Sequence, residues 1–129
     1  MLDTNIVSSI LRNRTGEAAC RFRETMPGSA GTSILVGAEL RFGYLKTGSA
    51  RLRDLVENFL ADVDVADWVE PCGIIYAELR TDLVRRGALI GPMDMLIAAH
   101  ALALDAVLVT DNEREFGRVA GLKVENWIR

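Results

Sequence analysis

Carboxylates stand beside small polar residues at several separate places in this chain. Asp3 lies close to the start, Glu39 follows an apolar run, and Asp94 opens a segment of helical character. Asp111 directly follows the apolar stretch 106–110. Carboxylates that converge repel one another, and burying each of them unpaired costs several kcal/mol. A hard divalent cation removes that conflict, so the pattern predicts a site for Mg²⁺ or Mn²⁺, which prefer oxygen ligands and retain water.

Polar neighbours of these acids suit the same chemistry. Thr4, Asn5 and Thr110 are candidates to hydrogen-bond the metal ligands or a scissile phosphate. Turn and cap chemistry is the alternative for all three. Taken singly, Asp94 is explained as a helix cap and Glu39 as part of a solvated helix face. The joint pattern instead favours a metal site that activates water for attack on a phosphodiester.

The apolar pattern predicts which elements position the acids. Strands are expected at 2–7, 31–36, 63–69, 106–110 and around 122–124. Helices are expected at 8–13, 17–25, 37–45, 50–60 and 71–86, from Pro92 onwards, and as a short turn at 113–116. This alternation is typical of an α/β fold with a central, mainly parallel sheet flanked by helices. Such sheets place ligands beyond the carboxyl ends of their strands, where Asp3, Glu39 and the Asp111 region fall.

Length and charge limit the possible architectures and partners. A chain of 129 residues, half of them hydrophobic, fits one compact domain over residues 1–129. The 15 basic and 18 acidic residues give a net charge of −3, which argues against a simple electrostatic nucleic-acid coat. The charge does not exclude an enzyme that cuts nucleic acid, because a metal reverses the local sign of an acidic site.

Cysteine usage and hydropathy indicate the compartment. Cys20 and Cys72 are far apart and neither belongs to a C-x-x-C pair, so we expect two buried free thiols rather than a zinc site or a disulfide. The apolar runs are too short to span a membrane. We therefore expect a soluble cytoplasmic protein with no membrane contact.

Four blocks of the sequence resemble, in the same order, the signature blocks of PIN-domain ribonucleases, and the VapC toxins of bacterial toxin–antitoxin pairs in particular. The similarity covers essentially the whole chain and continues through the tail 121–127. The blocks are Leu2-Asp3-Thr4-Asn5-Ile6, Ala38-Glu39-Leu40-Arg41-Phe42-Gly43, residues 91–101 and residues 108–116.

This resemblance implies a PIN-like fold and a Mg²⁺- or Mn²⁺-dependent endoribonuclease that cleaves structured RNA, often tRNA or rRNA. It also implies a homodimer that is held inactive by a cognate antitoxin of the VapB type. The segment that such an antitoxin wraps around the toxin would bring a basic side chain to the acidic crevice.

The resemblance also assigns the metal ligands. Asp3, Glu39 and Asp94 occupy the positions of the three main acidic ligands. Many relatives carry an acid two residues after the threonine of the fourth block, where this chain has Asn112. Three arrangements remain open: Asp111 replaces that acid, Asn112 binds through water, or Glu115 reaches in from the following turn. We favour Asp111 by a narrow margin.

The other polar candidates carry weaker signals. His100 lies six residues beyond Asp94 in an alanine-rich helix, with no catalytic partner evident, so we expect a structural role. Several arginines are candidates for contacts with RNA phosphates, although scattered arginines are more often surface charges. They are Arg14, Arg41, Arg80, Arg85, Arg86 and Arg114.

Three alternative functions follow from the same acids. A phosphoryl-transfer domain of the haloacid dehalogenase type would carry a second aspartate two residues after Asp3, where Asn5 stands, and a lysine for which the chain offers no clear candidate. A receiver domain would need an adjacent acidic pair after the first strand. A non-catalytic PIN-like binding module is the third alternative, but three unpaired acids are a liability without a metal.

Overall fold

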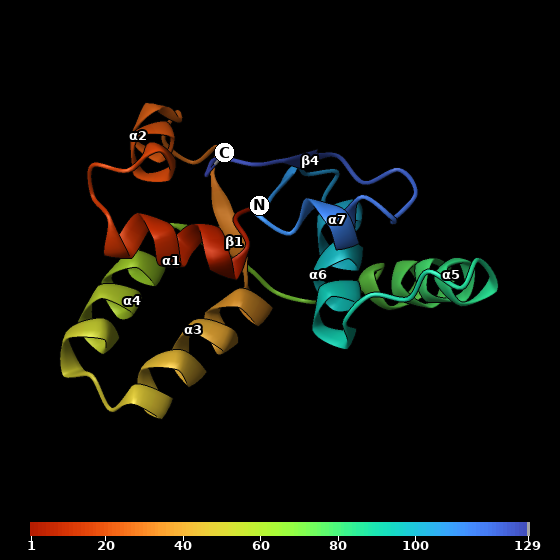
Figure 1. The fold of residues 1–129 in the computed structure, drawn as a ribbon, viewed down its shortest axis with the longest axis horizontal. Coiled ribbons are helices and arrows are strands. Elements are labelled where there is room, and N and C mark those ends of the chain that lie inside the picture. The colour runs from red at the N-terminus through yellow and green to blue at the C-terminus, as the bar shows by residue number, and fades with distance from the viewer. Residues whose placement is uncertain (129) are drawn as a thin grey trace.

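The fold is an α/β arrangement in which helices surround a short central layer of strands (Figure 1). The structure is a computed structural model, and it describes residues 1–128. The helices in this range are α1 (Thr4–Arg12), α2 (Glu17–Glu24), α3 (Ile34–Thr47), α4 (Ala50–Asp62), α5 (Cys72–Arg85), α6 (Pro92–Ala103) and α7 (Glu113–Phe116). The strands are β1 (Gly31–Ser33), β2 (Asp64–Ala66), β3 (Leu108–Val109) and β4 (Val124–Glu125).

Leu2 joins two pairs of parallel strands into one layer. β1 pairs with β2 in the register Thr32 to Val65, and β3 pairs with β4. Leu2 makes parallel bridges to both Thr32 and Val109, so the start of the chain lies between β1 and β3. All of these pairings are parallel, which confirms the predicted sheet. The residues that follow Leu2, β1 and β3 consequently emerge at the same edge of the layer.

Two predicted strands are much shorter than the sequence pattern indicates. The strand expected at 2–7 is wrong, because only Leu2 pairs and α1 begins at Thr4, where the Asp3 carboxylate accepts a hydrogen bond from the Thr4 backbone N–H. The strand expected at 31–36 ends at Ser33, whose side chain accepts from the Leu35 N–H at 3.0 Å. In both places a helix N-cap outweighs the β propensity of the apolar residues that follow.

The remaining predicted elements occur with shifted ends. The third predicted strand contracts to Asp64–Ala66, the fourth to Leu108–Val109, and the last lies at Val124–Glu125. The helices predicted at 50–60, at 71–86 and from Pro92 are present, as is the turn at 113–116. The first helix starts four residues earlier than predicted, so Asp3 lies at a helix start rather than inside a strand. Glu39 lies in a helix as predicted, in the second turn of α3.

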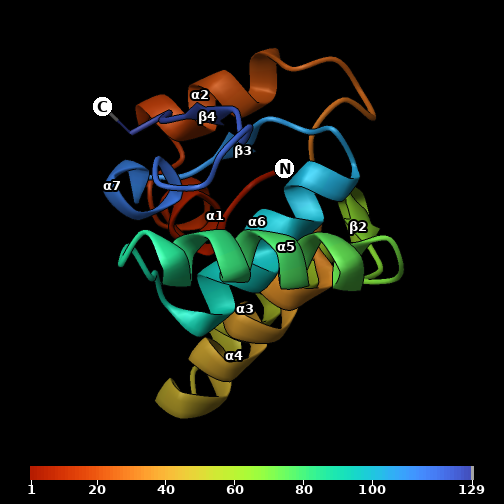
Figure 2. The ribbon, with the colours of Figure 1, turned by 90° about the vertical axis from the view of Figure 1, so that its right-hand side faces the viewer.

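The core centres on α6, which lies between the strand layer and α5 (Figure 2). Ile97, Ala98, Ala99 and Ala101 have no exposed surface, and the small side chains of the three alanines allow close packing around the helix. A helix that is apolar on every side belongs in such an interior. Both cysteines are free as predicted, although only Cys72 is fully buried. Within residues 1–128, no helix combines the length and the apolar character needed to cross a membrane.

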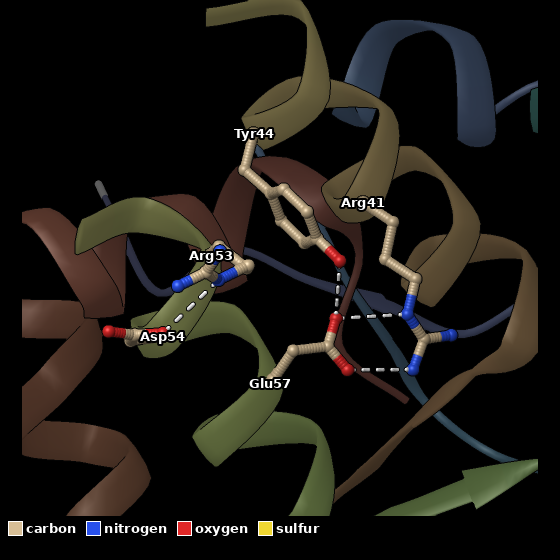
Figure 3. Close-up of polar contacts among 5 residues, drawn as sticks. All are labelled: Arg41, Tyr44, Arg53, Asp54 and Glu57. Atoms are coloured by element: carbon tan, nitrogen blue, oxygen red, sulfur yellow. Dashed lines mark hydrogen bonds and ion pairs between the residues drawn. The ribbon is translucent and has the colours of Figure 1, made fainter. Parts of the chain in front are cut away.

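An exposed polar cluster ties α3 to α4 (Figure 3). Arg41 donates two hydrogen bonds to the Glu57 carboxylate, each 3.1 Å long, and the Tyr44 hydroxyl donates a third at 2.9 Å. The bonds from Arg41 and then Tyr44 lower the pKa of Glu57. Ion pairs this exposed contribute little to stability. The Arg41 guanidinium nevertheless already has a partner within the fold, the Glu57 carboxylate.

Candidate active site

Asp3 is a buried carboxylate held by three donors. Its Oδ1 accepts from the Thr4 N–H at 2.8 Å, and its Oδ2 accepts from Thr110 Oγ1 at 2.7 Å and from Asn5 Nδ2 at 3.4 Å. Only 4% of its surface is exposed. Burial raises the pKa of Asp3, while the hydrogen bonds from Thr110 and Thr4 act in the opposite direction. Asp3 lies at the start of α1 and beside the end of β3, so donors from both elements hold its side chain in place.

Glu39 reaches the same place from α3. It lies in the second turn, and its Oε1 accepts a hydrogen bond of 2.6 Å from Thr4 Oγ1. Thr4 therefore contacts two acids, Asp3 through its backbone N–H and Glu39 through its hydroxyl. This residue brings the first and second acidic positions of the sequence together.

Asp94 and Glu115 form the other half of the site. Asn112 Nδ2 donates to Asp94 Oδ2 at 3.1 Å and to Glu115 Oε2 at 3.0 Å. Burial raises the pKa of Asp94 to about 7, aided by a hydrogen bond with Glu115 and by the negative charges of Asp3, Glu115 and Glu39. The same contact with Asp94, followed by the bond from Asn112, lowers the pKa of Glu115. These opposite pKa shifts favour protonation of Asp94 over Glu115 in the metal-free site.

These observations define an acidic cluster of Asp3, Glu39, Asp94 and Glu115. Three of its members are the acids that the sequence places at the main ligand positions, and the structure brings all three together. Glu115 is the acid that completes the cluster, although the sequence argument ranked it behind Asp111. Its position in α7, one helical turn after Asn112, is the signal that supports its inclusion.

The corner formed by residues 110–112 is fixed by side chains from distant segments. Thr110 Oγ1 accepts from the Asn112 N–H at 3.0 Å, and Asn5 Oδ1 accepts from the Asp111 N–H at 3.0 Å. The Asp111 carboxylate accepts a 3.0 Å hydrogen bond from Asn126 Nδ2, in the segment after β4. Asn126 was not among the sequence candidates, and its only signal was its place in the tail block 121–127.

The chemistry of the cluster suits a divalent cation. Its donors are carboxylate oxygens, and burial together with the neighbouring negative charges raises the pKa of Asp94. Among residues 1–128, no three acidic, histidine or cysteine side chains are already arranged to chelate a single ion. The carboxylates instead contact Thr4, Thr110 and Asn112, so a bound ion would have to replace some of these contacts and the Asp94 proton.

Comparison with known proteins assigns this fold and site to a family. Residues 1–122 match the family model of the PIN domain. The chain belongs to the PIN-domain family. A Ribonuclease VapC2 from Haemophilus influenzae is 36% identical over 129 residues, covering 99% of this chain and 97% of the relative. A tRNA(fMet)-specific endonuclease VapC from Shigella flexneri is 34% identical over 98% of this chain and 96% of its own length.

A solved structure agrees with this PIN domain over nearly its whole length. The chain superposes on VapBC2 from Rickettsia felis, a complex bound to a DNA fragment from its promoter, with a TM-score of 0.87. The two chains are 36% identical, and the match covers 98% of this chain and 97% of the other. The match confirms the predicted PIN-like fold, so the haloacid dehalogenase and receiver alternatives have no support.

Thr110 should be important for the stability of this PIN domain as well as for its site. We expect Thr110→Val, which keeps the shape of the side chain, to lower the free energy of unfolding by about 1–3 kcal/mol, because it leaves the Asn112 N–H without its acceptor and removes one of the three donors to buried Asp3. Urea unfolding monitored by circular dichroism measures the change. Thr81→Val on exposed α5, which loses only a bond to the Ala77 carbonyl, should cost less than about 0.5 kcal/mol. Equal losses in the two variants would contradict this role of Thr110.

His100 contacts the start of α3 rather than the acidic cluster. Its Nδ1 lies 2.7 Å from the Oγ of Ser33, the residue that caps α3, and both side chains are fully buried. Burial lowers the pKa of His100, whereas the backbone of Asp67 acts in the opposite direction. No hydrogen-bond partner for Nε2 occurs among residues 1–128. These contacts support the expected structural role, which is to join the helix that carries Asp94 to the helix that carries Glu39.

Three of the six arginines proposed to contact phosphates are engaged by neighbouring side chains. Arg41 binds Glu57, and Arg86 binds Asp82 at 2.7 Å. Arg80 donates to the Tyr76 hydroxyl at 2.8 Å. Their guanidinium groups are therefore partly satisfied within the fold, which reduces what they offer to a nucleic acid.

Proposed function

We propose that this PIN domain is a metal-dependent endoribonuclease that acts as the toxin of a toxin–antitoxin pair. The observation that carries the proposal is the acidic cluster, in which burial, followed by the hydrogen bond with Glu115 and the charges of the neighbouring carboxylates, raises the pKa of Asp94. Whole-length similarity to VapC ribonucleases supports RNA as the substrate. Structured RNA such as tRNA or rRNA is the proposed target, cut at internal phosphodiester bonds in the cytoplasm.

We assign the metal ligands to Asp3, Glu39, Asp94 and Glu115. Mg²⁺ or Mn²⁺ bound there would neutralise charge at the scissile phosphate and would lower the pKa of a water molecule, so that it can lose a proton and supply the hydroxide for hydrolysis. The protein prepares its own groups for this task. Thr4 orients Glu39, Thr110 and Asn5 fix Asp3, and the Asn112 amide bridges Asp94 and Glu115.

The proposed partners follow from the relatives. Superposition on a VapBC complex supports a VapB-type antitoxin for this chain, in a hetero-oligomer built on a toxin homodimer. The product of the small open reading frame adjacent to the gene is the first candidate. Co-expression with that product should yield a complex that survives purification, and failure of any neighbouring product to bind would count against the toxin assignment.

Metal removal tests the proposed reaction directly. Purified protein, freed of antitoxin, should cleave total tRNA in Mg²⁺ or Mn²⁺, should stop in EDTA, and should recover when the metal is restored in excess. Gel electrophoresis and sequencing of the new RNA ends measure cleavage and locate it. Asp3→Ala, prepared in parallel, controls for contaminating nucleases. Cleavage that persists in EDTA would contradict the mechanism.

A non-catalytic binding module is the competing function. The observation that favours it is the absence, within residues 1–128, of a preformed chelating group of three side chains. Such a module would bind RNA or antitoxin with no cleavage at any metal concentration. The cleavage experiment described above therefore distinguishes the two functions.

A further inference from the structure

An apolar hollow of about 420 Å³ adjoins the acidic cluster, between α1, α3 and α4. Two residues of the site, Thr4 and Glu39, form part of its wall. The other walls are largely aliphatic and include Leu11, Leu40 and Leu52. The hollow is therefore continuous with the place where a scissile phosphate would be bound, and its volume lies within the range of pockets that hold small organic groups.

Polar groups at this hollow remain available to a ligand. The Ser8 side chain, which lies on its wall, forms no hydrogen bond among residues 1–128, since only the Ser8 backbone carbonyl is engaged, by Arg12 Nε. A second hollow, of about 200 Å³, shares Leu11, Arg12 and Leu52 with the first and adds Arg51. The wall of the apolar hollow therefore includes Glu39 of the acidic cluster and Arg12, and the adjoining second hollow adds Arg51.

The two arginines at these hollows differ from their neighbours on α3 and α4. Arg41 and Arg53 are paired with Glu57 and Asp54 (Figure 3). Neither Arg12 nor Arg51 forms an ion pair within residues 1–128. Unpaired arginines beside an apolar hollow suit a chain of phosphates whose bases are unstacked.

We propose that the apolar hollow is a nucleobase subsite. It accepts one unstacked base from the nucleotide next to the scissile phosphate, while Arg12 and Arg51 contact the phosphates beyond. The inference rests on the proposed ribonuclease function and adds to it the form of the substrate, a single-stranded or looped RNA segment with an extruded base. Proteins that read RNA commonly do so on such splayed bases, because the deep groove of an A-form helix excludes side chains.

A nucleobase is the proposed ligand because the apolar hollow opens next to the acidic cluster. A base is joined to its phosphate through one sugar, so a phosphate held at the carboxylates places the neighbouring base within reach of Glu39 and Leu40. Aliphatic walls accept the faces of the base, and the Ser8 hydroxyl can bond its edge. The arginines then meet the next phosphates along the strand.

Gly43 offers a way to fill the hollow without disturbing its walls. It lines the hollow from the same face of α3 as Glu39 and Leu40, and a Cβ added there would have no atom within 4 Å. Leucine at this helical position should also fold well, since glycine is a poor residue inside a helix. Thr47→Leu adds the same side chain to an exposed position of α3 outside the hollow and serves as the matched control.

The experiment compares Gly43→Leu, Thr47→Leu and the parent on three synthetic RNA oligonucleotides that span a cleavage site mapped with the parent protein. One is intact, and each of the other two carries a single abasic ribonucleotide, on one or the other side of the scissile phosphate. We expect one abasic position to lower kcat/KM of the parent and of Thr47→Leu about five- to tenfold. Gly43→Leu should lose a similar factor on intact RNA and show no further loss on abasic RNA, because both changes remove the same contact.

The possible outcomes separate the hypotheses. An equal abasic penalty in the parent and in Gly43→Leu, or none in the parent, overturns the base subsite and leaves the ribonuclease function standing. Loss of antitoxin binding by Gly43→Leu with unchanged RNA kinetics would make the hollow a protein-docking surface and would also overturn it. No cleavage of any RNA by the parent overturns the proposed function, and the subsite with it.

Discussion

Asp94→Asn is expected to lower kcat/KM for RNA cleavage by about a thousandfold and also to make the metal-free protein more stable at pH 8. The loss of activity follows from the removal of a charged oxygen ligand at the centre of the acidic cluster. The gain in stability follows because the neutral amide is the same size as the carboxyl group but adds no negative charge beside Asp3, Glu39 and Glu115. If the Asp94 carboxylate stabilised the fold, Asp94→Asn would instead make the metal-free protein less stable.

The pH at which the stability gain appears follows from the pKa of Asp94. Its ordinary value is 3.8, and the native fold raises the pKa to about 7, so the native state binds the proton more tightly than the unfolded state. The stabilising effect of that proton is complete below pH 3.8 and is lost as the pH rises through about 7. Asp94→Asn should therefore gain on the parent between these two values and keep its advantage above pH 7. Because the side chain is partly exposed, we expect a gain on the order of 1–2 kcal/mol at pH 8 after allowing for solvent screening.

Thermal unfolding in EDTA at pH 5 and pH 8 measures this effect, and cleavage assays on the same preparations measure activity. Asp54→Asn is the matched control, since Asp54 is an exposed acid on α4 that pairs with Arg53 at the surface (Figure 3). That variant should resemble the parent in both assays. An Asp94→Asn protein that cleaves RNA at the parental rate would refute the proposed mechanism. A variant less stable than the parent at pH 8 would refute the charge repulsion.

The sequence predicted the placement of elements best where a clear local or topological signal was present. Pro92 and the acid in the first turn mark the start of α6, and the parallel order of the strands brings Asp3 and Glu39 to one edge. The strand lengths failed because Asp3 and Ser33 act as helix caps. A cap is one side-chain hydrogen bond, and nothing in an apolar pattern shows whether it will form.

The fourth acidic position depended on a contact that sequence order does not reveal. Asp111 and Glu115 are both acids near Thr110, and either has the chemistry of a ligand. In the structure Asp111 accepts a hydrogen bond from Asn126, which lies nearby because β4 pairs with β3, whereas Asn112 bridges Asp94 and Glu115. These contacts join segments far apart in the chain, and no local sequence motif encodes them.

Glu115→Gln should therefore affect the site far more than Asp111→Asn. We expect Glu115→Gln to weaken Mn²⁺ binding and to lower kcat/KM about a hundredfold, because it removes a charge that acts directly on Asp94. Asp111→Asn should stay within about threefold of the parent, since an amide oxygen still accepts the hydrogen bond from Asn126. Asn112→Ala should fall between them, at about tenfold, because it removes the bridge between Asp94 and Glu115 without removing a charge.

Calorimetric titration with Mn²⁺, together with initial cleavage rates at limiting metal, ranks the three variants. Far-ultraviolet circular dichroism of each variant checks that α7 and the 110–112 corner remain folded. The reverse order, with Asp111→Asn defective and Glu115→Gln unaffected, would restore Asp111 as the fourth ligand. Parental metal affinity in all three variants would reduce the ligand set to Asp3, Glu39 and Asp94. In that case Glu115 would act only by holding the proton of Asp94 in the metal-free protein.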